Sequence, residues 1–472
     1  MTNHKNDHNH CMKTSKVTLN NSIKLALPLM AAFLAQKFMQ FIDTLMMGWL
    51  GADALAAGGI ATAFFITVSV FCMGTLSAVG IFISRAKGSN DKEEIKSSFQ
   101  QGVMVVLLLS LPCMLIIWFM PYVLPYLGQN QEVIKNVELF LHGLVWGFPG
   151  FLLFLILREF IAAFSFTKTV MIVALGSIPV TFGLNYLLMY GNGLLPALGI
   201  AGIGYSGAVV MWMMFLCLYL YSAKKEVLKE FVSFRSFKID TAKIKDIFFI
   251  GAPSGLLFVL ESGMFLSATI MIGYIGVNEL AAYQIAIQCA IIAYALPIAL
   301  SMVTALQVGQ AVGSQNFSHV KQIIRINLVI ALVFALFTAS IFFFCPRILI
   351  SLFINSKEND FIQLNAISIT FLKIAAVFQI FDAIQTIANG ALRGLKDTFV
   401  PMLLSAFCYW IVGVGGAYIL AFNTSLKANG VWFGIILGIL CTSILLIMRL
   451  REKLLNLDEN VTRSNSHSYK QT

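Results

Sequence analysis

The chain has 472 residues, of which 58% are hydrophobic and only 11% are charged, and its mean hydropathy is +0.84. A soluble globular protein carries about 25% charged residues, so this composition excludes a soluble domain and indicates a polytopic membrane protein. The formal net charge of +10 does not indicate a nucleic-acid partner, because the basic residues lie between the apolar segments.

The first 22 residues are polar and lack the apolar core of a signal peptide. We expect a disordered cytoplasmic tail there, and the alternative is a metal-binding tail built on His4, His8, His10 and Cys11. The remaining cysteines are scattered and no C-x-x-C motif occurs. They are therefore expected to be packing residues.

The rest of the chain divides into apolar segments that are long enough to cross the roughly 30 Å hydrocarbon core of a bilayer. We expect an all-α integral membrane protein with twelve transmembrane helices. The predicted spans are 23–49, 58–84, 99–120, 136–164, 168–190, 200–221, 247–273, 280–306, 323–345, 362–391, 398–421 and 428–449.

Lysine and arginine gather in the N-terminal tail, in the even-numbered loops and after the last segment. All of these positions lie on one side of the membrane if there are twelve spans. Because basic loops stay in the cytoplasm, both termini are predicted to be cytoplasmic, in the inner (plasma) membrane of a bacterium. The long basic loop 222–246 belongs to the same side.

An internal repeat connects the two halves of the chain. Pro28 pairs with Pro253, 225 residues later, and at the same offset Leu55-Ala56-Ala57 pairs with Leu280-Ala281-Ala282. Six spans in each half predict two pseudo-symmetric lobes around a central cavity, related by an axis along the membrane normal. The predicted parts are a tail 1–22, an N-lobe 23–221, a linker 222–246, a C-lobe 247–449 and a tail 450–472.

Polar side chains recur at helical spacing inside several spans. In the tenth span five of them follow one helix face at steps of three and four residues. That face is expected to line the cavity. The set comprises Gln36, Gln40 and Asp43 in the first span, Thr181 and Asn185 in the fifth, Glu261 in the seventh, Gln284 and Gln288 in the eighth, and Gln379, Asp382, Gln385, Asn389 and Arg393 in the tenth.

The acids at membrane depth are Asp43, Glu261 and Asp382. A charged side chain there costs about 3 kcal/mol, so each needs a reason to be present. One interpretation is a protonated or hydrogen-bonded group that serves helix packing. The other is cation handling, in which the carboxylate takes up a proton or, with other oxygen ligands, a sodium ion.

Two further patterns bear on function. The chain contains no HExxH, GxSxG or Walker A motif, so we expect neither an enzyme nor a pump driven by its own ATP hydrolysis, and no cofactor. Gly430, Gly434 and Gly438 form a small-xxx-small ridge on the last span, which favours close helix contact.

The sequence resembles the MATE family (multidrug and toxic compound extrusion), and most of all its NorM branch. The resemblance spans roughly residues 20–450. It rests on FIDTLMMGWLGADALAA at 41–57, LES at 260–262, NELAAYQIAIQ at 278–288 and FDAIQTIANGALRGLKDT at 381–398. It implies a monomeric antiporter that exports small organic cations while sodium or protons enter.

The resemblance also implies roles for single residues. Glu261 and Asp382 match the cation-site carboxylates of the C-lobe, and they are the residues expected to hold sodium if sodium is the coupling ion. Asp43 matches the carboxylate of the N-lobe, and Asn185 matches an asparagine near it. Two positions depart from the pattern, where Phe378 stands for a tyrosine and Thr181 for a second asparagine. The residues expected to line the substrate cavity are Gln40, Thr181, Asn185, Gln284, Gln288, Phe378, Gln385 and Asn389.

Two other functions stay open at this stage. A flippase for lipid-linked sugars or other amphipathic metabolites has the same architecture, but it needs a basic cavity for pyrophosphate. A passive channel or membrane scaffold needs no coupled acids in either half.

Overall fold

The computed structural model describes residues 2–191, 196–232, 239–353 and 361–468. Within these residues the regular structure is helical throughout, and twelve helical spans are long and apolar enough to cross a membrane. The predicted number of spans is therefore confirmed. The spans are Val17–Trp49, Ala52–Gly88, Lys92–Tyr126, Gln131–Ala163, Thr167–Tyr190, Ile200–Lys224, Thr241–Ile275, Val277–Gly313, Phe317–Phe344, Ile362–Gly394, Phe399–Phe422 and Lys427–Leu457.

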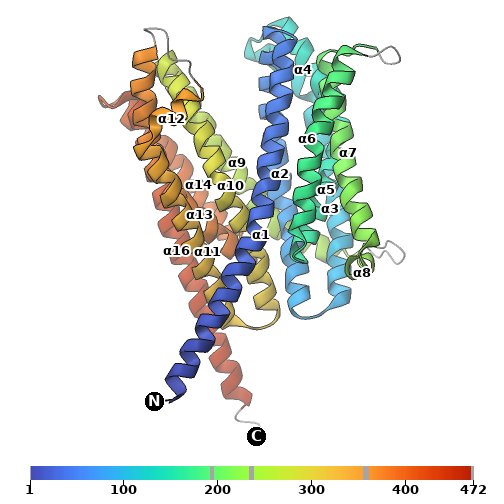
Figure 1. The fold of residues 1–472 in the computed structure, drawn as a ribbon, viewed down its shortest axis with the longest axis vertical. Helices are drawn as coiled ribbons and strands as arrows, with labels where there is room; N and C mark the ends of the chain where they lie inside the picture. Colours follow the sequence, from blue (N-terminus) through green and yellow to red (C-terminus); the bar gives the residue numbers. More distant parts are fainter. Residues whose placement is uncertain (1, 192–195, 233–238, 354–360, 469–472) are drawn as a thin grey trace. The chain divides into compact units, whose positions relative to one another are not determined.

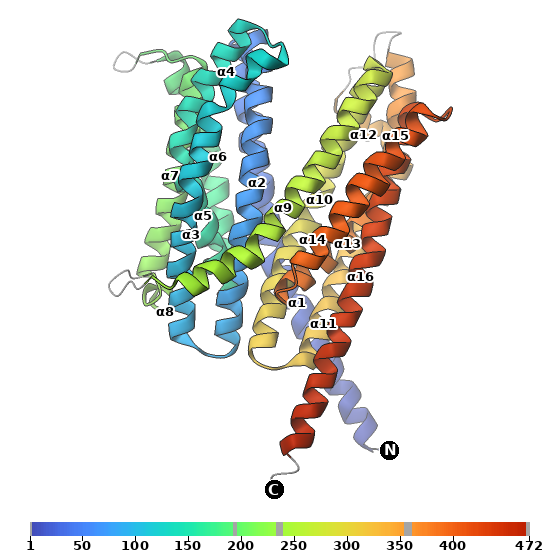
Figure 2. The ribbon, with the colours of Figure 1, turned by 180° about the vertical axis from the view of Figure 1, so that it is seen from behind.

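Several spans are built from more than one helical element (Figures 1 and 2). In the first half the elements are α1 (Thr2–Trp49), α2 (Ala52–Gly88), α3 (Lys92–Phe119), η1 (Met120–Leu127), α4 (Gln131–Leu144), η2 (Val145–Gly147), α5 (Phe148–Ala163), α6 (Thr167–Tyr190), α7 (Ile200–Lys224) and α8 (Glu226–Lys229). In the second half they are α9 (Thr241–Ile275), α10 (Val277–Gly313), α11 (Phe317–Phe344), α12 (Pro346–Ser351), α13 (Phe361–Gly394), α14 (Phe399–Ala406), η3 (Phe407–Val414), α15 (Gly415–Phe422) and α16 (Lys427–Ser468). The elements η1 and η2 are 3₁₀ helices and η3 is a π-helix.

The N-terminal tail differs from the expectation of disorder. The helix α1 already begins at Thr2, and no glycine or proline precedes Pro28 to interrupt it. At the other end α16 continues to Ser468 (Figure 2). The side chains of residues 2–16 lie outside the described part of the chain, so the metal-binding alternative for His4, His8, His10 and Cys11 is not addressed.

The two halves repeat the same local geometry. The turn after α2 and the turn after α10 each carry a residue in the left-handed region, Asn90 and Gln315, both with φ of 56°. The next residues, Asp91 and Asn316, cap α3 and α11 by accepting a backbone N–H three residues further on. Both pairs are 225 residues apart, which confirms the repeat in backbone conformation and hydrogen bonding.

The contacts divide the chain into two compact units, one of residues 27–255 and one of residues 1–26 with 256–472. The second boundary falls inside α9 and not in the 222–246 loop, because the beginning of α9 packs on α2. A Cβ added at Gly251 would meet the carbonyl group of Thr75. In the other unit the beginning of α1 is held by Ser22, whose hydroxyl donates to Gln307 Oε1 at 3.1 Å.

The unit of residues 1–26 and 256–472 contains the polar face predicted for the tenth span. Its α13 packs on α10, α11 and α16, around a core in which the fully buried ring of Trp432 lies near Tyr283, Phe371 and Phe378. The glycine ridge of α16 faces the preceding span, as the spacing predicted. A Cβ added at Gly438 would lie 2.7 Å from Gly413 Cα.

Candidate functional site

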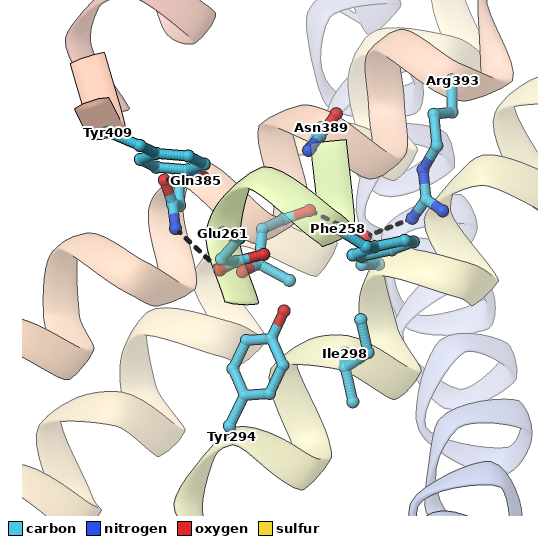
Figure 3. Close-up of a pocket in the computed structure, with 10 residues that line it drawn as sticks. Phe258, Glu261, Tyr294, Ile298, Gln385, Asn389, Arg393 and Tyr409 are labelled. Atoms are coloured by element: carbon cyan, nitrogen blue, oxygen red, sulfur yellow. Dashed lines mark hydrogen bonds between the residues drawn. The ribbon is translucent and has the colours of Figure 1, made fainter. Parts of the chain in front are cut away.

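A small pocket lies near the C-terminal end of α13, where this helix meets α9, α10 and η3 (Figure 3). The space open to the centre of a water molecule is about 10 Å³, enough for one water or a small ion and far below the size of a drug-sized ligand. The pocket is lined by Phe258, Glu261, Tyr294, Ile298, Ser301, Gln385, Thr386, Asn389, Arg393 and Tyr409.

The amide of Gln385 connects two acids. Its Nε2 donates to Asp382 Oδ1 at 2.9 Å and to Glu261 Oε1 at 3.4 Å. Its Oε1 accepts the hydroxyl of Tyr409 at 2.9 Å. Because Tyr409 donates to the carbonyl oxygen of the amide, the NH₂ end of Gln385 points toward the carboxylates. Asp382 is itself one turn from Gln385 on α13 and does not line the pocket.

A positive side chain lies in the same pocket. Arg393 is 7% exposed; its Nη2 donates to Ser301 Oγ at 2.9 Å, and the hydroxyl of Ser301 donates to the carbonyl of Thr386 at 2.7 Å. The guanidinium also lies over the ring of Phe258, 5.6 Å from its centroid. Figure 3 shows this group on the opposite side of Glu261 from Tyr409.

The electrostatics of this arrangement favour one additional cation. Glu261 and Asp382 share a single amide, and two ionised carboxylates so placed repel each other in a medium of low dielectric constant. A proton on one of them, or a monovalent cation near both, removes that repulsion. Within the pocket, oxygen ligands for a hard cation are present in the carboxylate of Glu261, the phenol of Tyr294 and the amide of Asn389.

The other unit contains a second acid with an amide partner. Asn185 on α6 donates its Nδ2 to Asp43 Oδ1 on α1 at 2.7 Å. The Asn185 side chain is fully buried, and its Oδ1 has no hydrogen-bond partner in the described part of the chain. Such an unpartnered buried oxygen is costly unless something is bound to it, so this pair is a candidate for a further cation.

Other residues predicted for the substrate cavity do not line this pocket. Gln284 and Gln288 are exposed on α10 and do not line the pocket. Gln40 accepts a hydrogen bond from Lys37 at 3.2 Å, and the hydroxyl of Thr181 donates to the carbonyl of Ser177 in its own helix at 2.9 Å.

Phe378 departs furthest from the expectation of a cavity residue. It is 3% exposed and packs in the core against Phe265 and Trp432. Gln379, the first member of the α13 stripe, accepts a hydrogen bond from Thr338 on α11. The polar stripe therefore serves two neighbours: its first residue faces α11, whereas Gln385, Asn389 and Arg393 face the pocket.

Sequence reasoning missed the two phenols and Ser301. The hydroxyl of Tyr294 was hidden in an apolar run, although Ile298 and Ser301 follow it at helical spacing. Tyr409 could not be found from a 3.6-residue period, because it lies in the π-helical segment η3. Phe258 was not predicted either, although it lies one turn before Glu261 and its position beside the acid could have been found from that spacing.

Twelve spans, an internal two-fold repeat and an ion-sized pocket with paired acids define the class of multi-pass membrane transporters. The MatE family model matches the chain twice, over residues 28–187 and 253–419, so each half of the repeat carries one copy. The chain belongs to the MATE family.

The relatives and the solved structures agree with this assignment. The chain is 36% identical to a protein of Pseudomonas aeruginosa named "Probable multidrug resistance protein NorM", over 95% of this chain and 92% of that one. It is 33% identical to the protein of the same name from Synechocystis, over 91% and 94%. A MATE protein solved in a bent conformation shares the fold with a TM-score of 0.84 at 19% identity, over 93% and 96%, and a eukaryotic MATE transporter with a TM-score of 0.81 at 20% identity, over 95% and 99%.

Proposed function

We propose that this protein is a secondary antiporter, which exports cationic, amphipathic organic compounds while sodium ions or protons enter. The relatives named as multidrug resistance proteins support small organic substrates. The observation that carries the proposal is the single amide of Gln385, which donates to both Glu261 and Asp382 in a pocket that fits an ion.

In the proposed cycle this chain's own groups hold the coupling ion. With the ion bound, the two acids carry less net charge and the Gln385 amide keeps its bonds to both. Without the ion, the acids are ionised and attract an organic cation to the protein. Ion and substrate then bias one two-state equilibrium in opposite directions, which is the condition for coupling.

Alternating access needs parts of the chain that bend, and two helices have the required feature. α1 passes from one unit to the other between Ala26 and Leu27, next to Pro28. α9 does so between Gly255 and Leu256, next to Pro253. A proline inside a helix removes a backbone hydrogen bond and permits bending, so we propose these prolines as paired hinges.

The available driving force is sufficient for useful export. A tenfold ion gradient supplies about 1.4 kcal/mol per ion, and one charge moving through about 100 mV supplies roughly 2.3 kcal/mol. Exchange of one monovalent ion for a monovalent organic cation cancels the voltage contribution and leaves the ion gradient. We propose the inner membrane as the location, with cytoplasmic termini and a monomeric protein.

The acidic pocket argues against the flippase alternative. Ionised Glu261 and Asp382 would repel the pyrophosphate group of a lipid-linked sugar. No specific feature of the described residues favours a passive channel over a coupled carrier.

The test uses purified protein in liposomes loaded with ethidium, under a sodium gradient alone or a proton gradient alone. Wild type should release ethidium under one of the two gradients, and Asp382→Asn should not. Ser340→Ala is a control, because Ser340 is exposed on α11 and its hydroxyl donates to the carbonyl of Leu336 in its own helix. Release that needs no ion gradient, or that survives in Asp382→Asn, would contradict the proposal.

A further inference from the structure

Two thiols lie side by side where η3 meets α16. Cys408 Sγ, on the π-helical segment η3, is 3.2 Å from Cys441 Sγ on α16. Cys408 is fully buried, whereas Cys441 is partly exposed. The pair therefore combines close contact with a route of access through one member.

The backbones of the two segments are in close contact beside the thiols. A Cβ added at Gly438, one turn before Cys441, would lie 3.0 Å from the carbonyl oxygen of Cys408. Disulfides form where Cα atoms lie within about 7 Å and the sulfurs can reach about 2.05 Å. The absence of a side chain at Gly438 and Gly413 is what permits this approach.

The surroundings select the kind of reagent that can reach the pair. Both cysteines lie within membrane-spanning segments, and the apolar side chains of Phe407 and Ile444 beside them are exposed. A charged oxidant is excluded from such a surface by the cost of leaving water, whereas a neutral, membrane-permeant one is not.

The pair is adjacent to a residue of the pocket. Tyr409 follows Cys408 directly, and its hydroxyl holds the amide of Gln385. A covalent bond from Cys408 to α16 fixes the segment that carries Tyr409. Any motion of η3 during ion exchange would then be restricted.

We propose that Cys408 and Cys441 are an oxidation site, at which a neutral two-electron oxidant of the quinone or diazene class converts the dithiol to a disulfide and locks η3 to α16. Both S–H bonds break and one S–S bond forms. Two protons and two electrons pass to the oxidant, which becomes the hydroquinone or hydrazine. The effect on transport rests on the proposed antiport; the formation of the bond does not.

A second thiol pair provides an internal comparison. Cys72 on α2 and Cys113 on α3 have their Sγ atoms 3.6 Å apart, and both are buried. Since neither is accessible and neither is next to a pocket residue, this pair should react more slowly and without consequence for the site.

The experiment treats purified protein in liposomes with diamide, alkylates the remaining thiols and identifies linked peptides by mass spectrometry without reduction. Wild type and Cys72→Ser/Cys113→Ser should both yield the 408–441 linkage. Ethidium efflux should fall about fivefold or more in both and return with dithiothreitol, a change equivalent to about 1 kcal/mol. Cys408→Ser and Cys441→Ser should keep their efflux in diamide.

Absence of the 408–441 linkage under conditions that oxidise other thiols would overturn the proposal. So would equal inhibition of wild type and Cys441→Ser, because the loss of efflux would then come from another site. If reduced wild type shows no gradient-driven efflux, the antiport proposal fails, while the linked peptide still decides whether the oxidation site exists.

Discussion

Gln385 donates its side-chain amide to Asp382 on its own helix and to Glu261 on α9, 124 residues earlier in the chain. The third bond of the amide, from Tyr409, fixes its orientation. The acids are thus joined through a neutral donor that stabilises their ionised forms. Removing that donor should make the empty pocket less favourable.

The first prediction concerns Gln385→Leu. Without the amide, the ionised acids lose a hydrogen bond to a charged group, worth about 1.5–3 kcal/mol. The coupling ion should bind more tightly and leave more slowly, so the half-saturating ion concentration and the maximal efflux rate should both fall, each by about tenfold. Tyr409→Phe should shift both in the same direction by less. A rise in the half-saturating concentration in either variant would contradict this account.

The second prediction concerns additivity of the acids. Because the proposed site shares one ion between both carboxylates, Glu261→Gln and Asp382→Asn should each reduce gradient-driven efflux to the same low level. The double variant should match the single variants within about twofold in residual efflux. If the two substitutions lower the efflux rate independently and additively in a double-mutant cycle, the acids do not act as one site.

The third prediction concerns Arg393. Its guanidinium repels a cation in the same pocket, so Arg393→Gln should lower the half-saturating concentration of the coupling ion by about tenfold. Arg393→Lys keeps the charge but loses the planar group over Phe258. That variant should bind the ion like wild type and melt at a lower temperature. Unchanged ion affinity in Arg393→Gln would show that the guanidinium does not repel the bound ion.

The fourth prediction concerns Phe378, which stands where the NorM pattern often has a tyrosine. Its ring packs against Trp432 and Phe265, away from the pocket. Phe378→Tyr should therefore leave the ion dependence of efflux within about twofold of wild type. A buried hydroxyl without a partner costs about 1–3 kcal/mol, so the melting temperature should fall. A marked change in ion selectivity with unchanged stability would argue that the phenol reaches the ion.

Much of the architecture was predictable from the sequence, because apolar length and internal repetition act over whole segments. The spans and the 225-residue offset between Pro28 and Pro253 needed no tertiary information. The glycine ridge on α16 was also predictable, since close helix contact requires small side chains at that period.

The site was predictable only in part, because it depends on which helix face meets which neighbour. The spacing on α13 placed Asp382 and Gln385 on one face. It did not predict that Gln379 faces α11, where it accepts a hydrogen bond from Thr338. Tyr409 joins the site through a π-helical segment, in which residues do not follow the 3.6-residue period. Gln284 and Gln288, which were predicted for the substrate cavity, are exposed on α10 and do not line the pocket.

The most direct test of the central claim measures ion release from purified protein in detergent when ethidium is added. Sodium release is followed with radioactive sodium, and proton release with a dye in weak buffer. Wild type should release one of the two ions as ethidium binds, and Glu261→Gln and Asp382→Asn should release less than about a tenth as much, a difference of about 1.4 kcal/mol in coupling. Release from both variants equal to that of wild type, or ethidium binding to wild type without release of either ion, would contradict the account.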